Sequence, residues 1–272
     1  MRISEAAAVR ITRAYANIFD YQLSEEELRF WCVYRVLPEY NHSRRIKPRR
    51  YTSRHKWNIA HRVAWWLKII PTVTCIGVTG GLAMNNAKGD DDIDFLVITK
   101  PATLWITRLV TTLVLDLFSL RRRPGDKTYK DKICLNMFMS ADALAVPEYE
   151  RDLFVAHEVL QMKPLWDRNE TYQKFLKTNS WVKKFLPTAW KEKNYELRIT
   201  NYEEKSRSSL RLLEPLAKKI QLWYMRKRRT TEVISDTLIR FHPVDAREWI
   251  YRELQKRLRG TNIPLDKIFY SR

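Results

Sequence analysis

The chain has 272 residues, which is enough to bury a sizeable core as one domain with additions or as two domains. Its apolar content of 45% is ordinary for a globular protein and argues against extensive disorder. The formal net charge of +19 at pH 7 is not ordinary, and it indicates either a polyanionic partner (nucleic acid or an anionic membrane surface) or simply a solvated basic surface.

The cysteines and apolar segments indicate in which cellular compartment the protein resides. The cysteines Cys32, Cys75 and Cys134 are scattered through apolar stretches. Their spacing does not suggest zinc, and buried reduced thiols are typical of a cytoplasmic protein. The N-terminus lacks the continuous apolar stretch of a signal peptide. Residues 103–120 form a long apolar segment, but Arg108 and Asp116 interrupt it, so we expect a buried helix and no membrane span.

Helices are expected at the N-terminus over residues 4–18 and 25–37. The second begins with a capping box, in which Ser24 and Glu27 satisfy each other's backbone N–H groups. Residues 41–56 follow as a segment rich in arginine, which is either a phosphate-binding arm or a solvated loop.

An amphipathic helix is expected over residues 56–70, before two apolar runs that indicate buried strands at residues 73–79 and 93–98. Gly80 and Gly81 end the first strand. Glycine at this point allows backbone N–H groups to approach a phosphate closely, at the start of a short helix.

Asp92 and Asp94 lie at the start of the second strand, so their side chains leave it on the same face. Two adjacent carboxylates repel each other, and burial makes the ionised state of both less favourable. A divalent cation removes this repulsion, and Mg²⁺ binds carboxylate oxygens together with substrate phosphates. The pair therefore predicts a Mg²⁺ site. The alternative is a hairpin with an acidic tip, where Asp90 and Asp91 only solvate a turn.

A strand, a glycine pair, a short polar segment and an Asp-x-Asp on the next strand together resemble the signature of the nucleotidyltransferase superfamily. This superfamily includes DNA polymerase β-like enzymes, CCA-adding enzymes and aminoglycoside nucleotidyltransferases. The resemblance implies that Asp92 and Asp94 bind Mg²⁺. It also implies that Gly80 and Gly81 contact the β- and γ-phosphates of a nucleoside triphosphate, and Lys88 is a candidate for further charge neutralisation.

The next expected strand, residues 133–140, places Cys134, Asn136 and Phe138 on one face. The superfamily usually carries a third carboxylate on this strand, and Asn136 is here the polar candidate within it. An amide oxygen can bind Mg²⁺ but does not act as a base at neutral pH. Asp131, a carboxylate from the C-terminal part or the substrate itself are alternatives for that role. A second departure is the second glycine of the pair, where many members have serine.

The C-terminal part is expected to form helices over residues 150–162, 172–186, 213–229 and 243–258, followed by a short tail that docks on the body. His157 in the first of them is more typical of a packing residue than of a catalytic base. Residues 188–207 are polar and weakly periodic, which indicates a linker. The basic run at residues 226–229 is either a phosphate-binding patch or a solvated helix end.

The expected fold is therefore α+β, with a small mixed β-sheet of nucleotidyltransferase type between flanking helices. The expected regions are an N-terminal helical region with a basic arm (1–54), the core (55–165) and a C-terminal helical region (166–272). The first hypothesis is a Mg²⁺-dependent enzyme that transfers a nucleoside monophosphate from a nucleoside triphosphate to an acceptor, for which the charge favours RNA. The alternative is a catalytically impaired protein that binds RNA or a ribonucleoprotein, and a toxin of a toxin–antitoxin pair is a further possibility.

Overall fold

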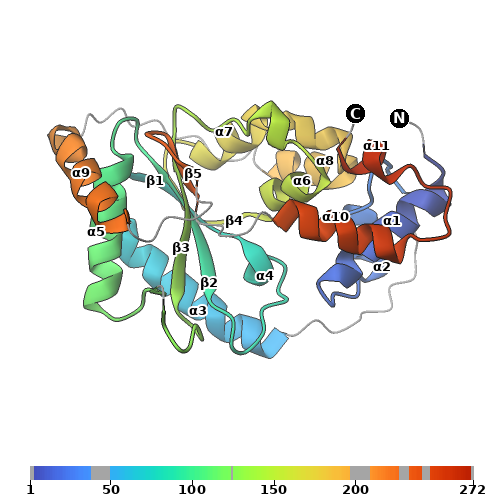
Figure 1. Ribbon diagram of the computed structural model, residues 1–272, viewed down its shortest axis with the longest axis horizontal. Coiled ribbons are helices and arrows are strands. Elements are labelled where there is room, and N and C mark those ends of the chain that lie inside the picture. The colour runs from blue at the N-terminus through green and yellow to red at the C-terminus, as the bar shows by residue number, and fades with distance from the viewer. Residues whose placement is uncertain are drawn as a thin grey trace.

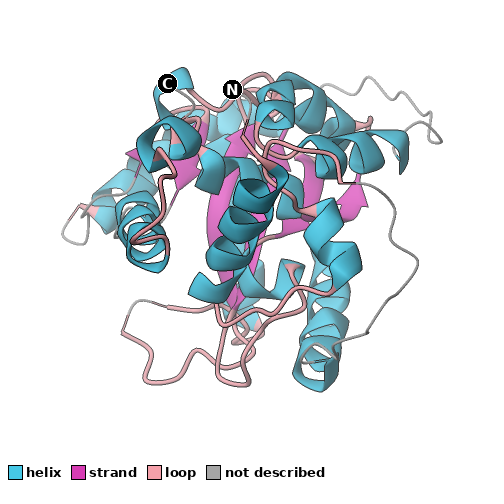
Figure 2. Cartoon of the chain, turned by 90° about the vertical axis from the view of Figure 1, so that its right-hand side faces the viewer, coloured by secondary structure: helices cyan, strands magenta, loops and turns pink. Residues whose placement is uncertain are grey.

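The computed structural model describes residues 3–37, 50–123, 125–196, 209–226, 233–240 and 246–270. Its centre is a six-stranded mixed β-sheet with the strand order β4-β1-β2-β3-β6-β5. Helices lie on both sides of this sheet (Figure 1), and the view turned by 90° shows the strands at the centre with helices packed around them (Figure 2). The expectation of a mixed α and β protein with a mixed sheet is confirmed.

The central strands are those that the sequence predicts: β1 (Val73–Val78), β2 (Ile93–Thr99) and β3 (Ile133–Ser140). β1 and β2 are antiparallel, whereas β2 and β3 are parallel. A parallel pair needs a crossover connection, and α5 (Leu104–Leu117) provides it across one face of the sheet. All residues of β1 are buried because both faces of the sheet are covered.

The outer strands are not predicted from the sequence. β4 (Lys163–Asp167) pairs antiparallel with β1, and the hairpin of β5 (Val233–Ile234) and β6 (Leu238–Arg240) continues the sheet beside β3. These strands are too short to show a clear alternation of apolar and polar residues. β4 also contains Pro164, which is tolerated at the edge of a sheet but resembles a helix stop in sequence.

The N-terminal helices are α1 (Glu5–Ile18) and α2 (Glu25–Phe30). The predicted capping box is present in α2. The hydroxyl of Ser24 accepts a hydrogen bond from the Glu27 N–H (3.1 Å), and the Glu27 carboxylate accepts one from the Ser24 N–H (2.9 Å).

Two sequence predictions of helical extent are wrong. The predicted helix over residues 25–37 ends early because Tyr34 adopts a left-handed backbone conformation (φ 59°) and donates its N–H to the carbonyl oxygen of Phe185. The expected helix over residues 172–186 is broken by Asn179, whose buried amide bonds the backbone of neighbouring segments. In both places tertiary hydrogen bonds override local helix propensity.

The expected linker over residues 188–207 is also wrong in its first part, which is helical. The remaining helices are α3 (Arg50–Leu67), α4 (Gly80–Ala83), α6 (Leu153–Gln161), α7 (Thr171–Thr178), α8 (Pro187–Glu196), α9 (Glu214–Met225), α10 (Ala246–Arg257) and α11 (Leu265–Phe269), with 3₁₀ turns at Glu148–Glu150, Ser180–Lys184 and Ser209–Leu213. The tail docks as expected, because the apolar side chains of α11 are buried. None of the described helices has the length and apolar character that crossing a membrane requires.

Some sequence expectations lie outside the described residues. These are residues 41–49 of the basic arm, most of the basic run at residues 226–229, the start of the last helix at residues 243–245 and the second half of the expected linker.

Two hydrophobic cores lie on the two faces of the sheet. On one face, Phe95 and Val97 of β2 pack in the core that contains side chains of α3, α5 and α9. On the other face, Leu96 and Ile98 pack in the core formed by the N-terminal helices and by α6, α7, α8, α10 and α11. There α1 and α10, from opposite ends of the chain, lie side by side (Figure 1). By the alternation of a strand, Asp94 faces this second core.

Candidate metal and nucleotide site

The predicted acidic pair forms a compact group with a residue of the neighbouring strand. Asp92, Asp94 and Cys134, which we call the acidic cluster, offer ligand atoms that all lie within 4.8 Å of one another. Cys134 is opposite Asp94 in the register of β2 and β3, and its thiol lies close to the Asp94 carboxylate. Burial and both carboxylates raise the pKa of Cys134, so the thiol stays neutral at physiological pH.

Asn136, the polar candidate for the place of the third carboxylate, is not paired with Asp94. The register of β3 against β2 is irregular: Leu135 and Met137 pair with successive residues of β2, which leaves Asn136 as the extra, buried residue. A bulge of one residue reverses the face of the sheet toward which each following side chain of the strand points. Phe138 therefore lies in the core under α5, so the expectation that it shares a face with Cys134 is wrong.

Gly80 lies directly against the acidic cluster. Its φ of +64° is in the left-handed region, and a Cβ atom at this position would be only 2.6 Å from Oδ2 of Asp94. Both conditions require glycine. Gly81 meets neither condition, because the nearest atom to its Cβ would be the carbonyl oxygen of Asn86 at 3.7 Å. The two glycines of the predicted pair therefore differ, and the second has room for the serine that the superfamily often carries.

The loop between α4 and β2 is held by Lys56, a fully buried cation of α3. Its Nζ donates to the backbone carbonyls of Asp91 (2.6 Å) and Gly89 (3.3 Å) and to Oδ1 of Asp131 (2.8 Å). Asp131, considered above as a replacement for the third carboxylate, is thus the counter-ion of Lys56 and lies outside the acidic cluster. Together these bonds fix the loop that leads into the acidic cluster.

A second cation reaches the cluster itself. Nη1 of Arg122 lies 2.6 Å from Oδ2 of Asp92, and its guanidinium group lies over the ring of Tyr129 at 4.1 Å. A metal ion bound by both carboxylates would share Asp92 with Arg122. The two cations would then face the same bound anion, which favours a polyphosphate.

Two partly buried carboxyl groups have strongly raised pKa values. Burial raises the pKa of Asp94 to about 7, and the charge of Asp92 adds to the shift. Burial also raises the pKa of Glu158 on α6 to about 7, and the charge of Asp94 contributes. Glu158 therefore belongs to the same electrostatic site. Sequence analysis assigned it no role, because no motif or spacing connects a helical glutamate to the distant Asp-x-Asp.

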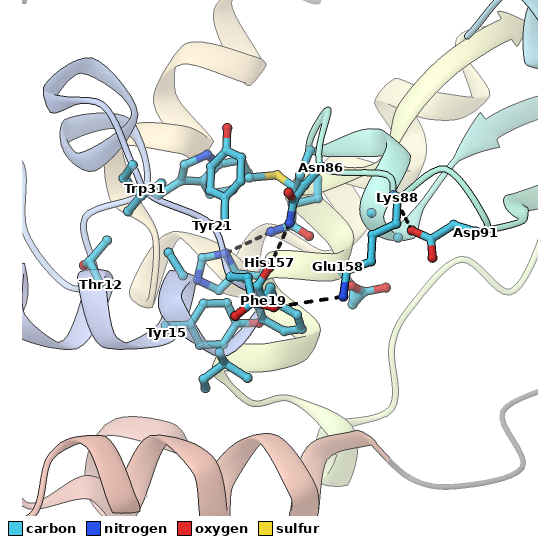
Figure 3. Close-up of a pocket in the computed structure, with 18 of the residues that line it drawn as sticks. Thr12, Tyr15, Phe19, Tyr21, Trp31, Asn86, Lys88, Asp91, His157 and Glu158 are labelled. Carbon is cyan, nitrogen blue, oxygen red and sulfur yellow. Dashed lines mark hydrogen bonds and ion pairs between the residues drawn. The ribbon is translucent and has the colours of Figure 1, made fainter. Parts of the chain in front are cut away.

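A pocket of about 420 Å³ opens beside these residues (Figure 3). Gly80, Gly81, Lys88 and Asp91 line it on the side of the sheet, and Glu158 lines it from α6. Its remaining walls, from α1, α6, α10 and the end of α2, are largely aromatic and include Tyr15, Phe19, Trp31, His157 and Trp249. The backbone N–H of Lys88 donates to the Asp91 carboxylate (2.7 Å), and its Nζ lies 4.0 Å from Oδ2 of Asp20.

His157 is a packing residue, in agreement with its interpretation from sequence. Its ring stacks on Tyr15 with 4.1 Å between centroids and an angle of 10° between planes, and Trp31 lies against it (Figure 3). Burial lowers the pKa of His157 to about 3, so the imidazole is neutral. A neutral, stacked ring shapes the pocket wall and carries no charge to a ligand.

No protein-family model matches this chain, and no curated protein or solved structure is significantly similar to it. The functional argument therefore depends on the geometry described above. That geometry brings together Asp92, Asp94, Gly80, Gly81 and Lys88 as the sequence predicts, adds Cys134 and Glu158, and leaves Asn136 at the bulge.

The two glycines give a matched pair of variants. Gly80→Ala is expected to lower the free energy of unfolding by about 2 kcal/mol or more, because a left-handed alanine costs about 1–2 kcal/mol and its Cβ would also collide with Asp94. Gly81→Ala is expected to be neutral or stabilising by up to about 1 kcal/mol, because its site is compatible with a side chain. Urea unfolding of both variants measures the difference. Equal losses in the two variants would contradict the assigned close contact at Gly80.

Asp94 is expected to make the metal-free protein less stable as the pH rises from about 4 to about 7. In this range the folded state, with a pKa of about 7, retains a proton that the unfolded state, near 3.8, has lost. Asp94→Asn removes this effect, so its stability relative to the native chain should increase by up to about 1.4 kcal/mol per pH unit. Thermal unfolding in EDTA across this pH range tests the expectation. A difference that does not change with pH would contradict the buried state of the carboxyl group.

Proposed function

We propose that this protein is a Mg²⁺-dependent nucleotidyltransferase that transfers a nucleoside monophosphate from a nucleoside triphosphate to an acceptor. The observation that carries the proposal is the close approach of Asp92, just before β2, and Asp94, within it, with Asp94 packed against the backbone of Gly80. The two carboxylates, as the proposed metal ligands, would lie next to backbone N–H groups at the end of β1.

The donor set of the acidic cluster fits Mg²⁺ through its oxygens. Asp92 and Asp94 would hold the ion, which supplies charge neutralisation of the triphosphate when it is bound. Cys134 would not be a ligand, because Mg²⁺ prefers oxygen. Its neutral thiol instead lies close to the Asp94 carboxylate and adds no charge to the site. Arg122, held by Asp92 at 2.6 Å, would add a fixed positive charge to the phosphate-binding side.

Backbone groups and Lys88 complete the proposed nucleotide contacts. Gly80 and Gly81 line the pocket without side chains, so their N–H groups are accessible to phosphate oxygens. The ammonium group of Lys88 is half-exposed beside the pocket and adds a further charge. Positioning and electrostatic stabilisation account for most of the rate of phosphoryl transfer, and these residues supply both.

Glu158 is the proposed acceptor of the proton. The acceptor group would attack the α-phosphorus, the bond between the α-phosphorus and the bridging oxygen would break, pyrophosphate would leave, and the proton of the attacking hydroxyl would pass to Glu158. A base with a pKa near 7 is suited to this transfer at neutral pH. Glu158 would thus serve in place of the third carboxylate that β3 lacks.

A second candidate function is favoured by one specific observation. Cys134 lies opposite Asp94, where a third carboxylate would complete the metal site. A thiol in this place suits a catalytically impaired protein that binds its partner, with RNA as the partner that the net charge favours. The two functions differ in whether nucleotide is transferred.

Transfer is expected from nucleoside triphosphates labelled at the α-phosphate and not from those labelled at the γ-phosphate, into either RNA or a smaller acceptor, and only with Mg²⁺. Asp92→Asn and Asp94→Asn should each abolish it, because each removes a charged metal ligand. Asp90→Asn is the matched control, since Asp90 is an exposed carboxylate of the same loop. Absence of transfer, with RNA bound equally by all variants, would favour the second candidate.

Glu158→Gln is expected to reduce kcat about 10²- to 10⁴-fold and to remove the acidic limb of the pH–rate profile near pH 7. Stabilisation of the folded protein by Mg²⁺ should change little, because Glu158 is not a member of the acidic cluster. Glu148→Gln, an exposed change outside the pocket, serves as the control. An unchanged pH–rate profile in Glu158→Gln would exclude Glu158 as the base.

A further inference from the structure

Most of the large apolar side chains that the described residues expose belong to α5, α9, the turn before α9 and the C-terminal end of α3. These elements lie at one end of the molecule (Figure 1). We call this the apolar end. Its members include Trp223 on α9 (65% exposed), Leu117 on α5 (78%) and Ile69 just after α3 (68%). The ring of Trp66 packs on Phe118 at 4.8 Å, which joins α3 to α5 here. Exposed apolar side chains in this number on neighbouring helices are typical of a contact with another molecule or a membrane.

The pattern of α9 explains why this surface is exposed. Ala217, Gln221 and Met225 are buried, and Gln221 Nε2 donates to the carbonyl oxygen of Trp105 on α5 (2.7 Å). α9 is therefore already docked by one face. Leu216, Ile220 and Trp223 follow at helical spacing on the other face, and all are about half-exposed or more. Among the residues that the structure describes, α9 therefore presents apolar side chains on its outer face as well as on its docked face.

The charges around the apolar end are positive. Arg211, Lys219 and Arg226 are exposed on the outer side of α9 and the turn before it. The nearby acids are engaged: Asp116 is bound by Arg121 and Arg123 at 2.9 Å each, and the Glu214 carboxylate accepts from the N–H groups at the start of α5 (2.7 and 2.8 Å). The surface therefore combines exposed aliphatic and indole groups with cations.

This combination selects among possible partners. A second copy would bring two chains of net charge +19 together at their basic ends, which electrostatic repulsion opposes. Nucleic acid would satisfy the cations but would leave Leu216 and Ile220 without an apolar environment. An anionic bilayer surface satisfies both, since basic amphipathic helices with Leu and Trp lie in the membrane interface and tryptophan is enriched there.

We propose that the apolar end binds the surface of an anionic lipid bilayer, with α9 lying in the interface and its Leu216, Ile220 and Trp223 side chains inserted. The pocket beside the acidic cluster lies between α1, α6 and α10, toward the other end of the molecule, and stays accessible in this arrangement (Figure 1). The inference does not depend on the proposed transferase activity, and the two are tested by separate measurements.

Co-sedimentation of the full chain with vesicles tests the proposal. Vesicles of phosphatidylcholine with phosphatidylserine should bind it at least about tenfold more tightly than phosphatidylcholine alone, with binding that weakens as salt is added. The double variant Ile220→Gln/Trp223→Gln should lose at least about tenfold in binding, as should Lys219→Glu/Arg226→Glu. These side chains are exposed, so the variants should fold, which circular dichroism verifies. Tyr149→Gln, an exposed aromatic residue away from the apolar end, is the matched control and should bind normally.

Several results would overturn the proposal. One is the absence of binding to anionic vesicles, and another is equal binding to neutral ones. A third is equal loss in Tyr149→Gln and in the α9 variants. Light scattering that shows a dimer abolished by Ile220→Gln/Trp223→Gln, without vesicle binding, would assign the apolar end to a second copy. Loss of RNA binding in the same variants, again without vesicle binding, would assign it to nucleic acid.

Discussion

The contact between the Asp94 carboxylate and the backbone of Gly80 is the constraint on which the site depends. It joins the end of β1 to the beginning of β2, where the N–H of Thr79 also donates to the carbonyl oxygen of Asp94 (3.0 Å). A carboxyl group held this way is partly removed from water and lies beside a second carboxylate, and both effects raise its pKa to about 7. Keeping this carboxyl group ionised at such a position costs free energy, and a bound cation or a proton offsets that cost.

The distribution of charge within the molecule is uneven, and this affects how its net charge is interpreted. The chain carries +19 overall, yet the pocket is lined by the carboxyl groups of Asp20, Asp91 and Glu158 together with the ammonium group of Lys88. The excess of positive charge therefore lies elsewhere, and part of it surrounds α9. The net charge favours binding of a polyanion, but it does not indicate that the polyanion binds in the pocket.

The parts of this structure that local sequence pattern controls could be predicted. The three central strands, the capping box at Ser24 and the shared face of Asp92 and Asp94 follow from hydrophobic runs, cap chemistry and the alternation of a strand. The parts that depend on non-local contacts could not. Asn136 was the polar candidate because a regular strand was assumed, but the structure pairs Cys134 with Asp94 and leaves Asn136 at the bulge. Glu158 was missed because it comes near the cluster through tertiary packing, in which α6 lies against α4.

The late hairpin of β5 and β6 has a consequence for how the chain reaches its native state. β6 pairs with β3 across a long stretch of intervening chain, Ile239 completes the core on the α5 side, and Arg240 clamps the buried Glu150 (2.7 and 3.0 Å). Bringing β6 to β3 closes a long loop, and this closure costs conformational entropy. We therefore expect the pairing of β6 with β3 to form late in folding. Until it forms, β3 is an unpaired edge next to the acidic cluster, and an isolated core segment would offer that edge to other chains as a template for aggregation.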